Sequence, residues 1–171
     1  MASLIIVTET TQLLFGLGGY ADPGPRLWGM MWGATELSAS LGASGDRDGR
    51  WLDPYLMARS LCLAGAADAG VAAIDTVEAD IRDVEQVRGA AFEGRRDGFT
   101  GKACIHPAQV DAVNDEFSPT EEERAWAQRV IGAFEADPGA GVVRLDDMMI
   151  DKPHLRVARR LLGIDAAPGT R

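Results

Sequence analysis

The fold is decided by the stretch LWGMMWG at residues 27–33. It contains no charged side chain and no alternation of polar with apolar residues, which is typical of a strand that is buried on both faces. Three further short runs rich in apolar residues lie at residues 4–7, 71–77 and 99–105, and helical patterns separate the four runs. We therefore expect an α/β fold in which helices cover both faces of a parallel sheet.

The predicted helices of this first part carry their own start and stop signals. Pro54 stands in the first turn of a predicted helix over residues 54–69, and Gly70 ends it. Asp83 is placed to cap a helix that runs to about residue 96. These signals predict four strand–helix units within residues 1–117.

The rest of the chain follows a different pattern. A capping signal that begins at Ser118 precedes a predicted helix to about residue 136. An extended hairpin or arm is expected over residues 142–150, and a closing helix over residues 152–162. We expect one domain over residues 1–117 and an appendage over residues 118–171 that consists of a helix, an extended arm and a closing helix.

Composition excludes several classes of protein. The 171 residues have 46% hydrophobic content, and 26 acidic against 17 basic residues give a charge of -9, which disfavours a nucleic-acid partner. No run approaches the roughly 18 consecutive apolar residues of a membrane span. Cys62 and Cys104 are isolated and follow neither a disulfide pattern nor a metal-binding spacing. We expect a reduced, cytoplasmic protein with no membrane partner.

Acidic residues gather after the predicted strands. In parallel α/β folds the carboxyl ends of the strands share one face, and sites collect there. That face is predicted to carry Glu9, Thr35 and Glu36, His106, and the acidic group Asp75, Glu78 and Asp80. Carboxylates without cysteine or lysine among them indicate a hard cation, and Mg²⁺ fits better than zinc.

A purely structural role is also open to several residues of this face. Glu9 and Glu36 stand where helices begin and could equally interact with the positive end of a helix dipole. Asp83 is better explained as a helix cap than as a ligand. A lone histidine such as His106 is more often structural than metal-binding. Composition and pattern alone therefore leave two interpretations open, a carboxylate metal site and a purely structural role for these residues.

Five segments in order resemble the HpcH/HpaI aldolase and citrate lyase family. They are Val-Thr-Glu-Thr at residues 7–10, WGATELSASLGA at residues 32–43, Ala-Ile-Asp at residues 73–75, GFTGKACIHPAQV at residues 98–110, and Met-Ile-Asp-Lys-Pro at residues 149–153. The resemblance covers essentially the whole chain at the family's own spacing. It is therefore more specific than any single motif.

The resemblance implies a (β/α)₈ barrel of the TIM type with a C-terminal helical extension. Residues 1–117 then correspond to the second half of the barrel and residues 118–171 to the extension. A barrel of this kind typically takes about 250 residues. We expect the chain to be a fragment, a split gene product or a truncated paralogue, and to pair with a missing N-terminal half because half a barrel has exposed strand edges.

The resemblance also implies a site. Glu9 and Glu36 fall on the family's two Mg²⁺ ligands, although the family's usual wording has aspartate at the second position. The backbone N–H groups of Gly33, Ala34 and Thr35 are candidates to bind a substrate carboxylate. Asp151 lies on an aspartate that in several members acts as acid or base on the acyl-CoA of a neighbouring subunit, which implies a homo-oligomer, most simply a trimer. Asp151 also suits a helix cap.

The implied reaction is cleavage of a 3-hydroxyacyl-CoA, such as citryl-CoA or malyl-CoA, to acetyl-CoA and a keto acid, or the reverse condensation. Two alternatives stay open: an aldolase that acts on free keto acids such as pyruvate, and a non-catalytic subunit that only pairs with another barrel. The arginine that binds substrate in such enzymes belongs to the missing half. We therefore expect the isolated chain to be inactive.

Overall fold

The computed structural model describes residues 3–22, 24–43, 46–47 and 50–164. The chain divides into two compact units, of which the first extends to Phe117 and the second begins at Ser118. Among the described residues, no helix is both long enough and apolar enough to cross a bilayer.

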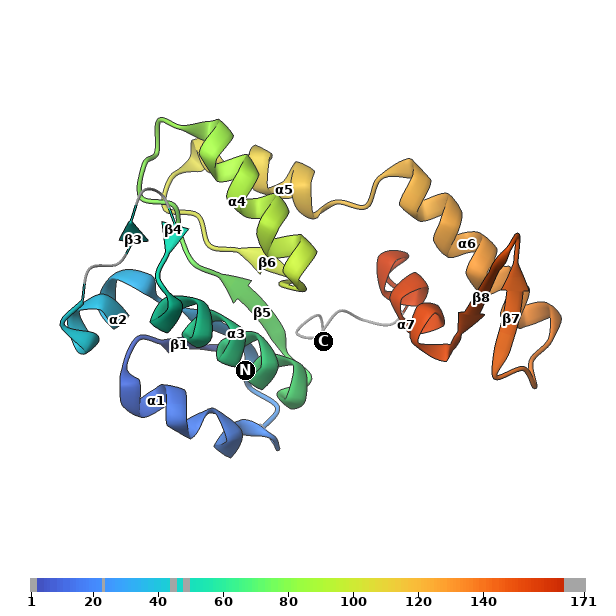
Figure 1. Ribbon diagram of the computed structural model, residues 1–171, viewed down its shortest axis with the longest axis horizontal. Helices are drawn as coiled ribbons and strands as arrows, with labels where there is room; N and C mark the ends of the chain where they lie inside the picture. Colours follow the sequence, from blue (N-terminus) through green and yellow to red (C-terminus); the bar gives the residue numbers. More distant parts are fainter. Residues whose placement is uncertain (1–2, 23, 44–45, 48–49, 165–171) are drawn as a thin grey trace. The chain divides into compact units, whose positions relative to one another are not determined.

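A four-stranded sheet forms the centre of the first unit (Figure 1). Its strands are β1 (Leu4–Thr8), β2 (Leu27–Trp32), β5 (Ala72–Asp75) and β6 (Gly101–Lys102). The spatial order is β1-β2-β5-β6, and each neighbouring pair is parallel. This sheet confirms the parallel α/β class predicted from the apolar runs.

Helices connect the strands. They are α1 (Thr11–Gly16), the 3₁₀ helix η1 (Leu17–Tyr20), α2 (Ala34–Leu41), α3 (Asp53–Ala69), α4 (Val84–Asp97), the 3₁₀ helix η2 (Pro107–Gln109) and α5 (Val110–Phe117). A small antiparallel pair, β3 (Asp46–Arg47) with β4 (Arg50–Trp51), lies in the connection between α2 and α3.

The helix ends follow the predicted signals. Gly70 and Gly98 end α3 and α4 with φ of 65° and 109°, a left-handed conformation that suits glycine. The side chain of Asp83 accepts the backbone N–H of Gln86 at 2.9 Å, so it caps α4. Short-range chemistry therefore sets these boundaries.

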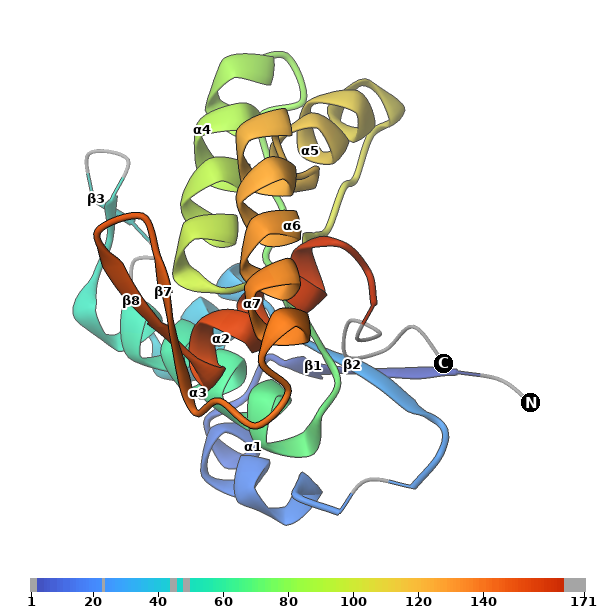
Figure 2. The same cartoon turned by 90° about the vertical axis from the view of Figure 1, so that its right-hand side faces the viewer.

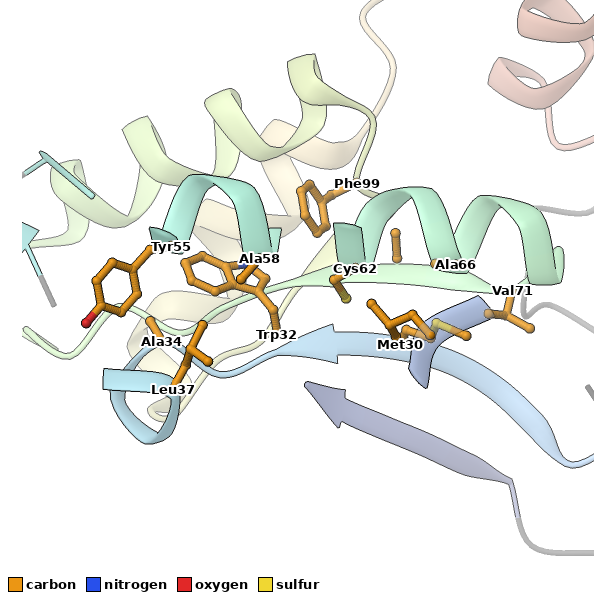
Figure 3. Close-up of a cluster of buried hydrophobic side chains, with 12 residues drawn as sticks. Met30, Trp32, Ala34, Leu37, Tyr55, Ala58, Cys62, Ala66, Val71 and Phe99 are labelled. Carbon is orange, nitrogen blue, oxygen red and sulfur yellow. The ribbon is translucent and has the colours of Figure 1, made fainter. Parts of the chain in front are cut away.

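The main core lies between the sheet and α3 (Figure 3). Met30 and Trp32 of β2 have no exposed surface, nor do Tyr55 and Cys62 of α3. The Trp51 ring meets the Trp32 ring edge-on, with 5.4 Å between the centroids. Beside β6, α4 and α5 pack against each other around Val87 (Figure 2). The first cluster therefore joins β2 and β5 to α3, and the second joins α4 to α5.

Two predicted strands are shorter than expected. The run at residues 71–77 forms a strand only over Ala72–Asp75, and the run at residues 99–105 only over Gly101–Lys102. Beyond Lys102 the chain leaves the sheet, and backbone N–H groups there bind the side chain of Gln109 in place of a neighbouring strand. The side-chain carbonyl of Gln109 accepts the N–H of Ile105 at 2.9 Å and that of His106 at 3.3 Å.

The second unit is built from α6 (Glu121–Ala136), the hairpin β7 (Val142–Leu145) and β8 (Met148–Asp151), and α7 (Lys152–Leu161). Thr120 and Glu123 form a capping box at the start of α6. The hairpin is antiparallel and pairs Leu145 with Met148. The core of this unit joins α6, β8 and α7 through Ala127, Val130, Ile131, Phe134, Ile150 and Ala158.

The two cysteines provide a test of how α3 packs. Burial raises the pKa of the Cys62 thiol to about 11, and partial desolvation also raises the pKa of the Cys104 thiol, but Cys62 is buried whereas Cys104 is exposed to reagents. A raised pKa leaves less thiolate, which is the reactive form. We expect one thiol of the native chain to react rapidly with DTNB at pH 8 and the second to react only after denaturation. Equal rates for both thiols in the native chain would contradict the packing of α3 on the sheet.

Candidate functional site

The site begins where β1 and β2 end. Thr8 pairs in register with Trp32, and both side chains are fully buried. The next residue of each strand therefore leaves the sheet at the same level, which brings Glu9 beside Gly33. The N–H of Gly33 donates to the Thr8 carbonyl at 3.1 Å and fixes this approach. Gly33 then serves as the N-cap of α2, whose first turn contains Glu36.

Two carboxylates converge on Gly33. A Cβ atom built on this glycine would lie 2.7 Å from Cγ of Glu9, 3.0 Å from Oε2 of Glu36 and 3.3 Å from Oε1 of Glu9. The structure thus brings together three residues that the sequence analysis had selected. No lysine or arginine within the described ranges forms an ion pair with Glu9 or Glu36. Two carboxylates held close together without a cationic partner favour a bound cation.

The chemistry of these donors fits Mg²⁺. Carboxylate oxygens are hard ligands, and Mg²⁺ is usually held by one or two carboxylates, with water and substrate completing its shell. Throughout the residues that the structure describes, no group of three or more histidine, cysteine, aspartate or glutamate side chains could enclose a metal. A closed zinc site of four protein ligands is therefore absent from those residues.

The first turn of α2 provides backbone donors beside the carboxylates. No side chain caps this helix, and the first N–H groups of a helix have no partner within it. Of the three residues predicted to bind substrate, Gly33 already donates its N–H to Thr8. Ala34 and Thr35 remain as candidates. Backbone N–H groups at a helix N-terminus are suited to a carboxylate group.

A cavity of about 470 Å³ opens beside this turn within the first unit. The cavity is lined by Ala34 and Thr35, by residues 76–80, by Trp51 and by one face of α4. Two of the predicted substrate-binding residues therefore border an open space. The carboxylates of Glu78, Asp80 and Glu93 also line the cavity.

The acidic group after the third predicted strand does not join the carboxylate pair. Asp75 is 3% exposed and accepts hydrogen bonds from Trp32 Nε1 at 2.5 Å and from Arg59 Nε and Nη2 at 3.1 and 2.8 Å. Glu78 pairs with Lys102, and Asp80 accepts the N–H of Arg82. The prediction that Asp75, Glu78 and Asp80 belong to the metal site is therefore wrong, because these side chains already have protein partners.

His106 also has a structural role. Its Nδ1 accepts the N–H of Ala108 at 3.1 Å, so it caps the short helix η2. Sequence reasoning missed Arg59, Lys102 and Gln109. The signal available for Lys102 was its place within an otherwise apolar predicted strand.

Asp151 lies in the second unit at the N-terminus of α7. Its Oδ1 lies 2.5 Å from Nδ1 of His154 and accepts the backbone N–H of that residue at 3.4 Å. The hydrogen bond from the His154 side chain lowers the pKa of Asp151 below its ordinary value. The cap that the sequence suggested is therefore formed. The side chain is still 47% exposed, so its carboxylate is accessible to solvent.

The profile of the HpcH/HpaI aldolase/citrate lyase family matches residues 5–107, which include both carboxylates and nearly all of the parallel sheet. The chain belongs to this family. A second profile, described as a C-C bond lyase of the TIM-barrel fold, matches residues 77–167. The HpcH/HpaI family and the fold class expected from the ordered motifs are thus confirmed.

Relatives of the HpcH/HpaI family align with most of the chain. It is 39% identical to the citrate lyase subunit beta-like protein of Mycobacterium tuberculosis over 93% of this chain and 58% of that protein. It is 37% identical to a (3S)-malyl-CoA thioesterase of Cereibacter sphaeroides over 81% of this chain and 48% of the other. The chain thus spans about half of the length of these curated relatives.

A solved structure of the family gives the same fold. The structure of protein CitE from Mycobacterium tuberculosis, in complex with magnesium, acetoacetate and coenzyme A, superposes with a TM-score of 0.79 at 34% identity. The match covers 94% of this chain and 60% of that one. Magnesium is therefore bound by a homologue whose fold this chain shares.

Proposed function

We propose that the chain supplies the Mg²⁺-holding part of a carbon–carbon lyase that acts on 3-hydroxyacyl-CoA thioesters. Cleavage of a substrate such as citryl-CoA or malyl-CoA would give acetyl-CoA and a keto acid, and condensation would reverse it. The observation that carries this proposal is the convergence of Glu9 and Glu36 on Gly33. The magnesium, acetoacetate and coenzyme A in the mycobacterial structure support it.

In this proposal Glu9 and Glu36 hold Mg²⁺, and the N–H groups of Ala34 and Thr35 bind a carboxylate of the substrate. When bound, Mg²⁺ supplies a Lewis acid for the keto oxygen. With the cation held by Glu9 and Glu36, and the substrate carboxylate bound at the N-terminus of α2, the keto acid would lie at the carboxyl ends of β1 and β2. The cavity that Ala34 and Thr35 line gives the acyl group room beside the α2 turn.

Asp151 is the proposed acid or base, supplied by a neighbouring copy of the chain. Since its pKa lies below the ordinary value, it is a carboxylate at neutral pH. In the condensation direction this carboxylate accepts the proton from the methyl carbon of acetyl-CoA, and in the cleavage direction it returns the proton to that carbon. This role requires a homo-oligomer, for which we propose a trimer, located in the cytoplasm.

We further propose that activity requires strand–helix units beyond the four seen here, supplied by a further segment or by a second chain. The substrate-binding arginine implied by the resemblance would come from those units. Tests of activity therefore use the chain together with an N-terminal half-barrel, whereas tests of metal binding use this chain itself.

A second reaction is favoured by one relative, which is named a (3S)-malyl-CoA thioesterase. Hydrolysis of the thioester would release malate and free coenzyme A, whereas the lyase reaction releases acetyl-CoA and glyoxylate from the same substrate. Product analysis with malyl-CoA separates the two. Activity on a keto acid without coenzyme A would instead favour the aldolase alternative.

Calorimetry with Mg²⁺ tests the carboxylate pair directly. We expect Glu9→Gln and Glu36→Gln each to lower Mg²⁺ affinity at least about tenfold, because each removes an ionised ligand. Glu36→Asp, which restores the family's usual residue, should retain binding.

The matched control for this test is Glu85→Gln. Glu85 is also a glutamate in the first turn of a helix, α4, and its side chain is 86% exposed. If Glu9 and Glu36 only interact with helix dipoles, all three substitutions to glutamine will change the stability slightly. The Mg²⁺ affinity of each variant will then equal that of the wild type. That result would refute the proposed metal site and favour the non-catalytic alternative.

A further inference from the structure

The connection between β5 and α4 forms one wall of the cavity without helix or strand to hold it. Residues 76–80 all line the cavity, as do Ala34 and Thr35. A segment of this kind needs partners from elsewhere for its backbone carbonyl groups. We propose that Lys102 and Gln109 are positioning residues that hold this connection in place as the wall of the substrate cavity. The role as a substrate wall rests on the proposed function.

Lys102 holds the start of the connection. It is the last residue of β6 and pairs in register with Asp75, so its side chain begins at the level where β5 ends. Its Nζ donates to the Thr76 carbonyl at 2.7 Å and lies 3.1 Å from Oε1 of Glu78. The side chain of Lys102 is 2% exposed and that of Glu78 is 14% exposed. A lysine so deeply buried requires partners of this kind.

Gln109 holds the middle of the same connection. Its Nε2 donates to the Glu78 carbonyl at 3.0 Å, while its Oε1 accepts the N–H groups of Ile105 and His106. Gln109 is 1% exposed. One buried amide therefore joins the turn after β6 to the connection after β5. Lys102 and Gln109 stand at the two ends of a single stretch, residues 102–109, and both bind carbonyl groups of residues 76–78.

The charge of Lys102 has a second effect on the cavity. Glu78 lines the cavity, and Lys102 compensates its negative charge. Without that compensation the wall would repel an anionic keto acid placed at the first turn of α2. Lys102 therefore both orders the wall and adjusts its charge to an anionic substrate. The two effects can be separated by adding Glu78→Gln to Lys102→Met. The second substitution removes the negative charge of Glu78, whereas the Thr76 carbonyl still lacks the donor that Lys102 provided.

Backbone order parameters from ¹⁵N relaxation of the full chain test the proposal. We expect residues 77–80 to be rigid in the wild type, with S² of about 0.85, and to fall below about 0.6 in Lys102→Met and in Gln109→Met. The double variant Lys102→Met/Glu78→Gln leaves no unpaired buried charge and thus guards against a failure to fold. Its residues 77–80 should stay mobile, because the Thr76 carbonyl still lacks its donor.

Arg82→Met is the matched control. It removes an exposed cation from the same connection and should leave all these order parameters unchanged. The proposal is overturned if residues 77–80 keep wild-type order parameters in Lys102→Met or in the double variant. Mobility spread equally over β1, β2 and β5 would also overturn it, since that pattern indicates general destabilisation.

Binding of acetoacetate in the presence of Mg²⁺, measured for the chain together with an N-terminal half-barrel, provides the functional readout. We expect Lys102→Met to weaken this binding about tenfold or more, and the double variant to recover only the part due to charge. Full recovery in the double variant would refute the positioning role and leave only the charge effect. If the wild-type chain combined with an N-terminal half-barrel binds no acetoacetate, the proposed function fails, whereas the order parameters of the chain still decide whether Lys102 and Gln109 hold the connection.

Discussion

Replacing Gly33 with alanine is expected to reduce Mg²⁺ affinity on the order of 100-fold, because the new methyl group occupies the space between the two carboxylates. Its Cβ would lie 2.7 Å from Cγ of Glu9 and 3.0 Å from Oε2 of Glu36, so both side chains must move. The backbone itself accepts alanine, since φ of Gly33 is -110°. The loss is therefore steric. Calorimetry with Mg²⁺ measures it.

Gly16→Ala is the control for this prediction. Gly16 lies in the same unit, at the end of α1, and a Cβ built there meets nothing within 4 Å. We expect this variant to bind Mg²⁺ like the wild type. Unchanged Mg²⁺ affinity in Gly33→Ala would show that the glutamates do not need their observed positions, and the site would have to be built elsewhere.

Asp75→Asn is expected to lower the free energy of unfolding by about 3 kcal/mol, measured by urea denaturation at pH 7. Asp75 joins Trp32 of β2 to Arg59 of α3, and its side chain is 5% exposed. Asparagine keeps the shape of the side chain but leaves the half-buried guanidinium without its more deeply buried carboxylate. The cost therefore comes from the loss of the buried ion pair with Arg59 and not from a cavity.

Asp97→Asn serves as the comparison, because Asp97 contacts the same guanidinium from the surface. Its Oδ2 lies 2.6 Å from Nη1 of Arg59, and its side chain is 33% exposed. We expect a loss of about 1 kcal/mol or less. If both variants lose the same free energy of unfolding, the buried position of Asp75 does not strengthen its interaction with Arg59.

The pH dependence of this network has a defined sign. Partial burial acts to raise the pKa of Asp97, but the hydrogen bond and charge of Arg59 outweigh it and hold that pKa below 3.8. The stabilisation is thus present above pH 3.8 and is lost as pH falls through the lower native value. The Arg59–Asp97 interaction is therefore fully formed in the wild type at pH 7, the pH at which the Asp75→Asn and Asp97→Asn variants are compared with it.

Local signals explain why much of the fold could be predicted. Pro54, Gly70 and Asp83 mark helix ends through their own backbone or side-chain chemistry, and the structure confirms each of them. The end of β6 could not be predicted in this way. It depends on Gln109, which replaces the sheet ladder through a contact that no local pattern indicates.

The candidate site was predictable only where position along the strand was enough. Glu9 and Glu36 follow closely after β1 and β2, so the strand order alone brings them to one edge. Asp75 was misjudged because it is still part of β5 and its carboxylate turns toward Arg59, sixteen residues earlier in the chain. Pairing over such a distance is decided by packing, and periodicity does not report it.

Both proposed ligands lie within a single strand–helix–strand–helix segment, Leu4 to Leu41. A gene that is divided or joined between such segments therefore keeps the ligand pair together. The proposed cation site is in this sense modular, because it depends on none of the segments that would choose the substrate.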